Sequence, residues 1–364
     1  MKIGVLTLTP KNNYGGILQA TALCSYLENQ GHEVVLIDKK RFENSFFSRL
    51  VIQLLECVPF QNIKNKRQDY LKTKQLKPFL EKNLPRKSRE IVTVQDLQEL
   101  VEGESFDSVI VGSDQVWRYQ YIGDGHHNVF FLDFDTNKSV KKIAYAASFG
   151  KDEWEAPEHV AKVSSLLHSF DAISTREKSG VVLCKDLFGV SDAVNVLDPT
   201  MLIGAEFYDR FFDGSNISSC SRTIVTYILD WNDEKQDIIT SVKISLEDSF
   251  KSYFKQVNLS NKENGKFYGV EEWLWNIKNA EFVITDSFHG MVFSILFKKQ
   301  FIVIGNEKRG LSRFSDLLGD VGLSSRLMLN ESCIEGVIDK KIDYSIVEDK
   351  ISKLRRDSVL FINQ

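Results

Sequence analysis

The sequence lacks the features that define several large classes of protein. Its five cysteines are widely spaced and odd in number and form no CxxC pair, which argues against a disulfide framework and a zinc site. No stretch approaches the roughly 18 to 20 consecutive apolar residues that span a bilayer. The N-terminal residues 1–8 are too short and strand-like for a signal peptide. With a net charge of −4, the chain has no overall field that favours nucleic acid. We therefore expect a cytoplasmic protein that binds no nucleic acid.

Several catalytic fingerprints are also missing. The chain has neither GxGxxG in its first strand–helix turn nor GxxxxGK[ST] anywhere, so the dinucleotide and P-loop readings lack support. HExxH, GxSxG and paired-carboxylate elements are absent too. The adjacent His126 and His127 would point to different faces of any regular element. We predict no metal site and no cofactor.

What the sequence does contain is an alternation of apolar strands and helices. A strand at 2–8, a helix at 17–29 and a strand at 32–38 form a βαβ opening. The pattern resumes at 106 and starts a second series at 223, in a chain long enough for two domains. We predict an α/β fold with two Rossmann-like domains facing a cleft. The predicted domains are 1–202 and 203–344, with a helix at 345–364 that returns to the first domain.

Residues 41–100 interrupt this pattern. Between Lys64 and Arg89 there are ten Lys or Arg and two acidic residues. The simplest interpretation is a solvated helical insertion packed on the first domain. A sharper one is a basic surface that meets an anionic lipid leaflet, at the inner face of the membrane, or a lipid-diphosphate acceptor.

The most informative segment is 280–297, which predicts a buried strand, a sharp turn and an apolar helix beginning near His289. Ser287 or Asp286 can cap that helix, and Gly290 permits close approach to the backbone. A helix start after a parallel strand attracts anions, and His289 adds a proton donor of the residue type whose unperturbed pKa lies near neutrality. The alternative is a Ser-capped helix with a half-buried histidine.

Basic residues at two other strand ends extend this candidate anion site. Arg176 lies where a helix begins, a position that is poor for the helix dipole and good for binding an anion. Lys308, Arg309 and Arg313 follow the next strand. Together with His289, they describe a site for a small, doubly anionic ligand.

Two further clusters of polar residues follow strands of the first domain. Asn13, Tyr14, Gly15 and Gly16 suit a hydroxyl-rich ligand that approaches the backbone closely. In the second cluster, Asp114 and Gln115 are polar at a strand exit, and Trp117 offers a flat apolar face to a sugar. The alternatives are a plain loop for the first cluster and a helix cap with a core tryptophan for the second.

Five segments, taken in order and spacing, carry a family resemblance: Asn13–Ala20, Gly112–Trp117, Ala172–Glu177, Val196–Leu202 and Thr285–Gly290. On these the chain resembles the polysaccharide pyruvyl transferase family over nearly its whole length. The resemblance implies a fold similar to GT-B glycosyltransferases, phosphoenolpyruvate as donor and co-substrate, and a glycan acceptor that gains a pyruvate ketal as phosphate is released. It makes Arg176 similar to the family's donor-binding arginine and His289 to its essential histidine. Either Arg309 or Arg313 would be the second arginine.

The resemblance also suggests an acceptor, a galactose or mannosamine-type residue of a lipid-linked oligosaccharide used for bacterial capsule or exopolysaccharide. Asp114 is then a candidate base for the acceptor hydroxyl. One alternative is a nucleotide-sugar glycosyltransferase of the same fold, although no pair of acidic residues eight apart occurs near 305–318. Another is a non-catalytic glycan-binding protein.

Overall fold

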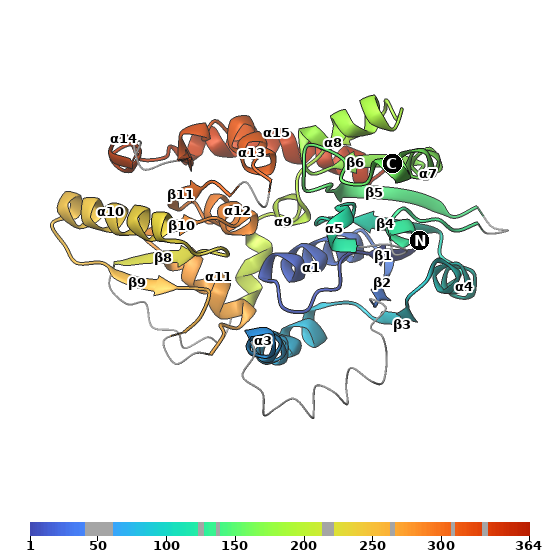
Figure 1. The fold of residues 1–364 in the computed structure, drawn as a ribbon, viewed down its shortest axis with the longest axis horizontal. Helices are drawn as coiled ribbons and strands as arrows, with labels where there is room; N and C mark the ends of the chain where they lie inside the picture. Colours follow the sequence, from blue (N-terminus) through green and yellow to red (C-terminus); the bar gives the residue numbers. More distant parts are fainter. Residues whose placement is uncertain are drawn as a thin grey trace. The chain divides into compact units, whose positions relative to one another are not determined.

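The chain divides into two compact units (Figure 1). The computed structural model describes residues 1–40, 61–122, 127–135, 139–212, 222–262, 266–306, 310–329 and 334–364. Unit 1 comprises Met1–Phe149, Glu153–Thr175 and Gly180–Asn195. Unit 2 comprises Gly150–Asp152, Arg176–Ser179 and Val196–Gln364.

Unit 1 is built on a parallel sheet in the order β3-β2-β1-β4-β5-β6-β7, counted over the described residues. Its strands are β1 (Lys2–Leu6), β2 (Glu33–Lys39), β3 (Lys87–Ile91), β4 (Ser108–Gly112), β5 (Lys141–Ala147), β6 (Ala172–Thr175) and β7 (Val194–Asn195). The chain moves outward from β1 to β3, then returns to β4 on the other side of β1. The carboxyl ends of β1 and β4 therefore form the topological switch point, where α/β proteins bind ligands.

The helices of unit 1 cover the sheet because their apolar faces have to be buried. They are α1 (Tyr14–Asn29), α3 (Gln61–Asn83), α4 (Val94–Glu104), α5 (Tyr119–Ile122), α6 (His127–Phe130), α7 (Val160–Leu167) and α8 (Lys178–Val182), with short turns η2 (Pro157–His159) and η3 (Leu183–Leu187). The first two residues of α8 belong to unit 2. Helix α1 is buried from Tyr14 to Leu27. It begins three residues before the predicted start because the Asn13 side chain accepts a hydrogen bond from Gly15 N at 3.0 Å.

The predicted helical insertion at 41–100 needs a correction. Residues 41–60 lie outside the described part of the chain, and α3 and α4 are helical as predicted. Between them, however, β3 pairs with β2 as the edge of the sheet. Its sequence, Lys-Ser-Arg-Glu-Ile, buries only Ser88 and Ile91. Charged side chains are typical of an edge strand and conceal it from a search for apolar runs.

Unit 2 has a second parallel sheet in the order β12-β11-β10-β8-β9, again over the described residues. Its strands are β8 (Thr223–Tyr227), β9 (Lys255–Asn258), β10 (Phe282–Thr285), β11 (Gln300–Ile304) and β12 (Leu327–Met328). The switch point of this sheet lies between β8 and β10. The predicted α/β class with two Rossmann-like parallel sheets is thus confirmed.

The helices of unit 2 include one that joins distant parts of the chain. They are α9 (Pro199–Leu202), α10 (Asp233–Phe250), α11 (Val270–Asn279), α12 (Phe288–Leu296), α13 (Ser312–Val321), α14 (Ile334–Ile338) and α15 (Tyr344–Ile362), with η4 (Glu206–Phe211) and η6 (Ser324–Arg326). Helix α15, the predicted C-terminal helix, clusters with unit 2. There Ser358 Oγ accepts a hydrogen bond from Leu197 N at 2.9 Å, and Arg355 Nε donates to Met201 O at 2.9 Å.

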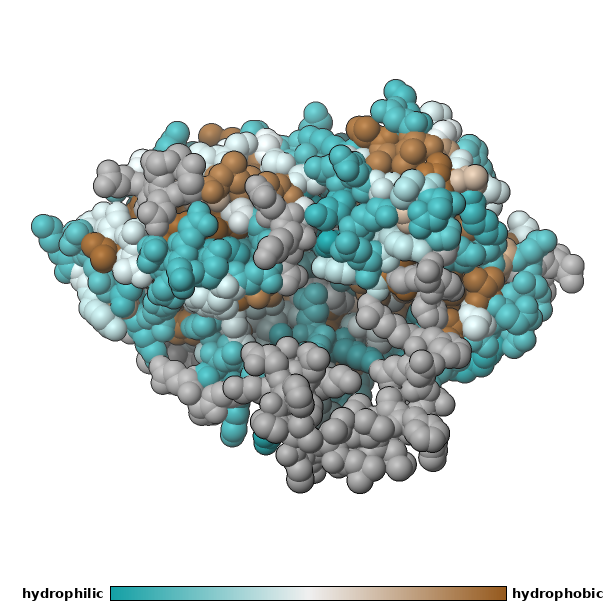
Figure 2. Space-filling view, in the orientation of Figure 1, coloured by the Kyte–Doolittle hydropathy of each residue, from teal (hydrophilic) through white to brown (hydrophobic). Residues whose placement is uncertain are grey.

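The surface is mostly hydrophilic on the face shown in Figure 2. A hydrophobic patch on that face lies over α8, where the Val182 side chain is exposed (Figure 2). Among the described residues, no helix combines the length and the apolar character needed to cross a membrane.

Candidate active site

The loop after β10 positions the segment that the sequence singled out. Ser287, and not Asp286, caps α12, since the Ser287 side chain accepts a hydrogen bond from Gly290 N at 3.4 Å. Thr285 Oγ1 accepts from Ser287 N at 3.0 Å and donates to Tyr227 O at 2.7 Å. These bonds set the turn at the end of β10, and they bring His289 into the first turn of a nine-residue helix.

Asp286 has a different role, that of joining the two loops at the switch point of unit 2. Its buried carboxylate accepts hydrogen bonds from Leu229 N at 2.6 Å and Asp230 N at 3.2 Å, both in the loop after β8. It also accepts from Lys235 Nζ at 2.6 Å and Asn306 Nδ2 at 3.2 Å. With these donors in place, Asp286 stabilises the loops around the site.

Gly290 is required by packing inside the protein. A Cβ at this position would overlap the Thr285 side chain. The same arrangement occurs after β6, where a Cβ on Gly180 would lie 2.9 Å from Thr175 Cβ. In both places, the group that approaches the glycine closely is the threonine that ends the preceding strand, five residues earlier in the chain.

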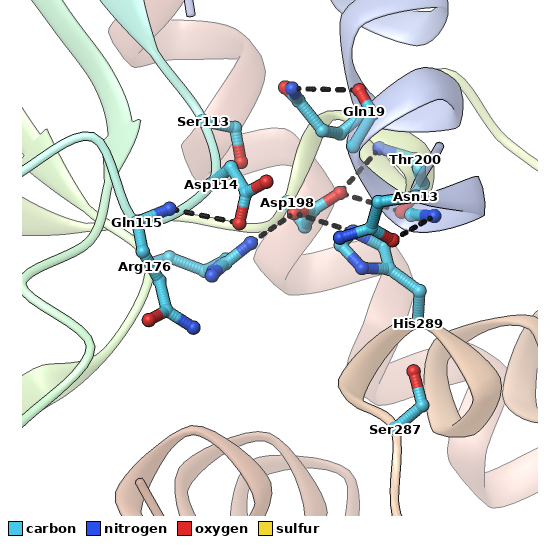
Figure 3. Close-up of polar contacts among 12 residues, drawn as sticks. Asn13, Gln19, Ser113, Asp114, Gln115, Arg176, Asp198, Thr200, Ser287 and His289 are labelled. Carbon is cyan, nitrogen blue, oxygen red and sulfur yellow. Dashed lines mark hydrogen bonds and ion pairs between the residues drawn. The ribbon is translucent and has the colours of Figure 1, made fainter. Parts of the chain in front are cut away.

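The centre of the candidate site is a buried carboxylate, Asp198, that contacts Arg176 and His289 (Figure 3). Asp198 Oδ2 lies 3.2 Å from Arg176 Nη1 and 3.5 Å from His289 Nε2. Its other oxygen, Oδ1, accepts hydrogen bonds from Thr200 N at 3.0 Å and Thr200 Oγ1 at 2.7 Å. The three charged or titratable side chains come from segments far apart in sequence, and all belong to unit 2.

The electrostatic balance keeps Asp198 ionised. Burial acts to raise the pKa of Asp198, but the adjacent His289 and Arg176 and the hydrogen bond from Thr200 N hold it well below its usual range. The ionised carboxylate beside the imidazole fixes the orientation of the ring. The Asp198 carboxylate also neutralises part of the Arg176 charge.

A second guanidinium lies close to the first. The Arg176 guanidinium carbon is 4.7 Å from the centroid of the Phe288 ring, and that of Arg313 is 5.6 Å from the same centroid. Both arginines are buried. Phe288 therefore brings two buried cations together beside His289, in the first turn of α12.

Of the predicted donor-site residues, the structure thus gathers Arg176, Ser287, His289 and Arg313. Lys308 and Arg309 lie outside the described residues. Asp198 was missed as a functional residue. The sequence could have indicated it through the segment Val196–Leu202, because Asp-Pro-Thr predicts a helix start capped by the aspartate.

In unit 1, two of the predicted clusters follow the two strands of the switch point. Asn13, Gly15 and Gly16 follow β1, and Asp114 follows β4. A Cβ on Gly16 would lie 3.4 Å from Asp114 Oδ2, so the two loops meet there. Asp114 adopts a left-handed backbone with a φ of 68°, and its Oδ1 accepts a hydrogen bond from Gln115 N at 2.9 Å.

Trp117 is not available to a sugar, so its predicted stacking role is wrong. The side chain is fully buried, its Nε1 donates to Phe130 O at 3.0 Å, and its ring stacks on Phe131 at a centroid distance of 5.3 Å. It is a core tryptophan, the alternative that the sequence left open. The large apolar area of an indole favours the core when its N–H finds a carbonyl there.

The side chains of two other predicted residues of unit 1 are buried and contact other residues of the protein. Gln115 is buried, and its Oε1 accepts a hydrogen bond from Arg118 Nη1 at 2.9 Å. Tyr14 is buried as well, with Lys72 Nζ of α3 at 4.8 Å from its ring centroid. Asn13 remains exposed at the start of α1.

Among the residues described, no group of three or more His, Cys, Asp or Glu is placed to hold a metal ion.

Fold and site together define a class: an α/β protein with two Rossmann-like units, one of which holds a buried Arg–Asp–His cluster suited to a small anion. The family model for polysaccharide pyruvyl transferase matches residues 13–308. The chain belongs to the polysaccharide pyruvyl transferase family, and its class of enzyme is that of a pyruvyl transferase. The family implies a pyruvate donor and a polysaccharide acceptor. No curated protein matches the chain significantly in sequence.

Solved structures show the same fold in more distant proteins. The UDP-GlcNAc 2-epimerase from Methanocaldococcus jannaschii is 13% identical with a TM-score of 0.55, over 94% of this chain and 93% of that one. The UDP-GlcNAc 2-epimerase from Neisseria meningitidis, bound to UDP-GlcNAc, is 10% identical with a TM-score of 0.51, over 99% of this chain and 100% of that one. At such identities the similarity shows the GT-B-like fold alone.

Proposed function

We propose that the protein transfers pyruvate from phosphoenolpyruvate to two hydroxyls of a glycan sugar, forming a pyruvate ketal and releasing phosphate. The observation that carries this proposal is the buried Arg176–Asp198–His289 cluster, with Arg313 close by on Phe288. Phosphoenolpyruvate carries a carboxylate and a phosphate on one small frame. Two guanidinium groups and a helix start match these two anions, because both provide directed N–H donors.

The reaction needs one proton delivered to carbon and two removed from hydroxyls. His289 protonates the methylene carbon of the donor, which makes C2 electrophilic, and the first sugar hydroxyl attacks that carbon and loses its proton. The C2–O bond to phosphate then breaks, the second hydroxyl closes the ketal, and its proton leaves with the phosphate. General acid catalysis of this kind contributes typically about 10²- to 10⁴-fold.

Asp198 positions His289 for this step. It lies on the Nε2 side of the ring, so Nδ1 is the nitrogen left to exchange a proton with the substrate. The Asp198 carboxylate, which stays ionised, holds the orientation of the ring during the transfer. Asp198 also orients the Arg176 fork, which binds one end of the donor.

The acceptor binds at the switch point of unit 1 in this proposal. Asn13 is exposed there and offers an amide to hydroxyl groups, whereas Gly15 and Gly16, the other predicted residues of this turn, are buried. Asp114 is the candidate base for the attacking hydroxyl. The acceptor we propose is a galactose or mannosamine-type residue of a lipid-linked precursor of a bacterial surface polysaccharide. The protein would act in the cytoplasm, in peripheral contact with the inner membrane.

Equilibrium binding tests the donor assignment directly. We expect calorimetry to show binding of phosphoenolpyruvate to the full chain, and to show weaker binding or none for UDP-galactose and UDP-GlcNAc. Binding should weaken when Arg176 is replaced by Met. Binding of the UDP-sugars without phosphoenolpyruvate would refute the proposal and favour a nucleotide-sugar glycosyltransferase. Binding of glycans alone would favour a non-catalytic glycan-binding protein.

A further inference from the structure

The open edge of the unit 2 sheet carries a cavity that lies outside the donor site. Strand β9 pairs with β8 and ends the sheet in the described part of the chain (Figure 1). The cavity measures about 720 Å³, and all of β9 lines it, together with Asn261, Lys262 and Tyr268. Ligand sites usually measure about 300–1,000 Å³. The edge of the sheet is therefore concave enough to hold a small ligand.

The lining of this cavity is rich in amides. Gln256, Asn258 and Asn261 supply three of them, and Asn258 Oδ1 accepts a hydrogen bond at 2.9 Å from the backbone N–H two residues later. The ammonium group of Lys262 is paired with the Glu272 carboxylate, at 2.7 Å and 2.9 Å from its two oxygens. An amide both donates and accepts hydrogen bonds, as a sugar hydroxyl does, whereas an anion only accepts them. The cavity therefore suits a neutral, hydroxyl-rich ligand.

A peptide that adds a strand to this edge fits less well. Strand β9 has only four residues, and it begins with the exposed Lys255. Short edge strands that carry lysine are protected against pairing with a further strand. The side chains of the cavity, and not the backbone of the edge, are therefore the groups that select its ligand.

The loop after β8 exposes an indole next to this region. Ser260 Oγ, in the loop after β9, donates a hydrogen bond to Ile228 O at 2.8 Å, so the two loops are in contact. Trp231 follows in the β8 loop and is 40% exposed, more than any of the other four tryptophans of the chain. An indole offers a flat apolar face to the C–H groups of a pyranose ring, and its N–H can donate to a hydroxyl.

Hydrogen bonds on both sides of Trp231 fix the loop that carries it. Asp230 N donates to Asp286 Oδ2 at 3.2 Å, and Asp230 O accepts from Lys235 Nζ at 2.8 Å. The Asn232 side chain accepts from Lys235 N at 2.9 Å and caps α10. A platform held in this way binds a ligand without the entropic cost of ordering a loop. Through Asp286, the loop also contacts the segment that leads into α12.

The sheet order β10-β8-β9 sets these features in a row, because the carboxyl ends of parallel strands lie along one edge of a sheet. We propose that unit 2 has a second glycan-binding site, in which Trp231 and the cavity beside β9 hold sugars that do not react. The inference rests on the proposed function, because it takes the ligand to be the acceptor glycan. It adds a place for the sugars that flank the reacting one, and it makes an oligosaccharide a better ligand than a single sugar.

The test compares galactotetraose, mannotetraose and cellotetraose with the methyl glycoside of each sugar. Binding to the full chain is measured by calorimetry, without phosphoenolpyruvate, for wild type and for Trp231→Ala, Trp231→Phe and Asn261→Ala. Asn279→Ala is the matched control, because Asn279 is an exposed asparagine of the same unit that donates to Trp275 O and does not line the cavity.

We expect at least one tetrasaccharide to bind wild type about 10-fold or more tightly than its methyl glycoside, since each further hydrogen bond adds about fivefold. Trp231→Ala should weaken that binding by about 10- to 30-fold, the range for a central aromatic side chain, and Asn261→Ala by about fivefold. Trp231→Phe keeps an aromatic face, so this variant and Asn279→Ala should bind nearly as wild type does. Tryptophan emission should change when the tetrasaccharide binds wild type, and should not change in Trp231→Phe.

Three results would overturn the inference: no tetrasaccharide that binds more tightly than its methyl glycoside, unchanged binding in both Trp231→Ala and Asn261→Ala, or an emission change that persists in Trp231→Phe. A dimer in sedimentation that Asn261→Ala dissociates would assign the cavity to a second copy of the chain and also contradict it. Ketal formation is measured separately. Its failure would count against the proposed function and leave oligosaccharide binding in unit 2 as an independent result.

Discussion

Replacing Asp198 with Asn removes one buried negative charge and keeps the shape of the side chain. The amide oxygen can still accept the hydrogen bonds that Thr200 N and Oγ1 donate. The amide NH₂ then faces Arg176 Nη1 and His289 Nε2, which stand 3.2 Å and 3.5 Å from the native oxygen. A donor replaces an acceptor, and the Arg176 charge loses its buried counter-ion.

The expected cost follows from the burial of the pair. Breaking a buried ion pair by removing one partner costs about 3–5 kcal/mol, because an uncompensated charge stays behind. We therefore expect the free energy of unfolding at pH 7 to fall by about that amount. Because His289 and the arginine proposed to bind the donor lose their support together, turnover of phosphoenolpyruvate should fall by at least about 10²-fold.

The loss of stability in Asp198→Asn should depend on pH in a definite direction. The pKa of Asp198 is depressed in the folded state, so its contribution to stability is present above the unfolded pKa and lost as the pH falls toward the folded one. An unfolded aspartate titrates near about 3.9. The difference in unfolding free energy between wild type and Asp198→Asn should therefore be fully present at pH 5 and shrink below about pH 4.

Urea unfolding at pH 7, 5 and 3 measures this difference. Asp343→Asn is the matched control, because Asp343 caps α15 through Ser345 N as Asp198 caps α9 through Thr200 N, but it is exposed. Asn and Asp cap helices about equally well, so the control should change stability little. A loss in Asp198→Asn no larger than that of the control, or a difference that does not change with pH, would refute the reasoning.

Three further predictions concern the same unit. His289→Gln should lower phosphate release by about 10²- to 10⁴-fold with phosphoenolpyruvate binding retained, and near-normal release would remove His289 from the mechanism. Arg313→Met should weaken phosphoenolpyruvate binding in calorimetry by about 10- to 100-fold, whereas Arg356→Met on the exposed side of α15 should not. Gly290→Ala should lower the unfolding free energy by about 1–3 kcal/mol, since its methyl group would overlap Thr285; an unchanged melting temperature would contradict this.

Much of the fold could be predicted from the sequence, because strands buried on both faces have to be continuous apolar runs. The predicted strands at 2–8 and 32–38 differ from β1 and β2 by at most two residues at either end. Strand β3 could not be found in this way, because an edge strand presents charged side chains to solvent.

The candidate site was predictable where it follows a single strand end, and not where it depends on distant partners. Ser287 and His289 follow from a strand, a turn and an apolar helix start. The contact of Asp198 with Arg176 and His289 depends on three segments separated by up to 113 positions in the chain, and no local pattern encodes it. Similarly, Asp286 looked like a cap because the loop after β8, which it binds, lies more than fifty residues away.

The burial of the Trp117 side chain is a second feature that the local sequence pattern could not predict. Trp117 follows a strand exit, a position that suits a sugar platform and a core residue equally. In the core of unit 1, the indole ring packs against Phe131, Phe149 and Phe170, whose ring centroids lie 5.1–6.1 Å from its own. Two of these partners lie more than thirty residues further along the chain, so the outcome depends on the tertiary structure.

The most direct test of the central claim is the mass of the product formed from phosphoenolpyruvate and a panel of galactosyl and mannosaminyl lipid-like acceptors. The account predicts a gain of one pyruvate less one water on an acceptor, with one phosphate released per ketal, and loss of both in His289→Gln. Phosphate release without a ketal, or no product on any acceptor together with no binding of phosphoenolpyruvate, would contradict it.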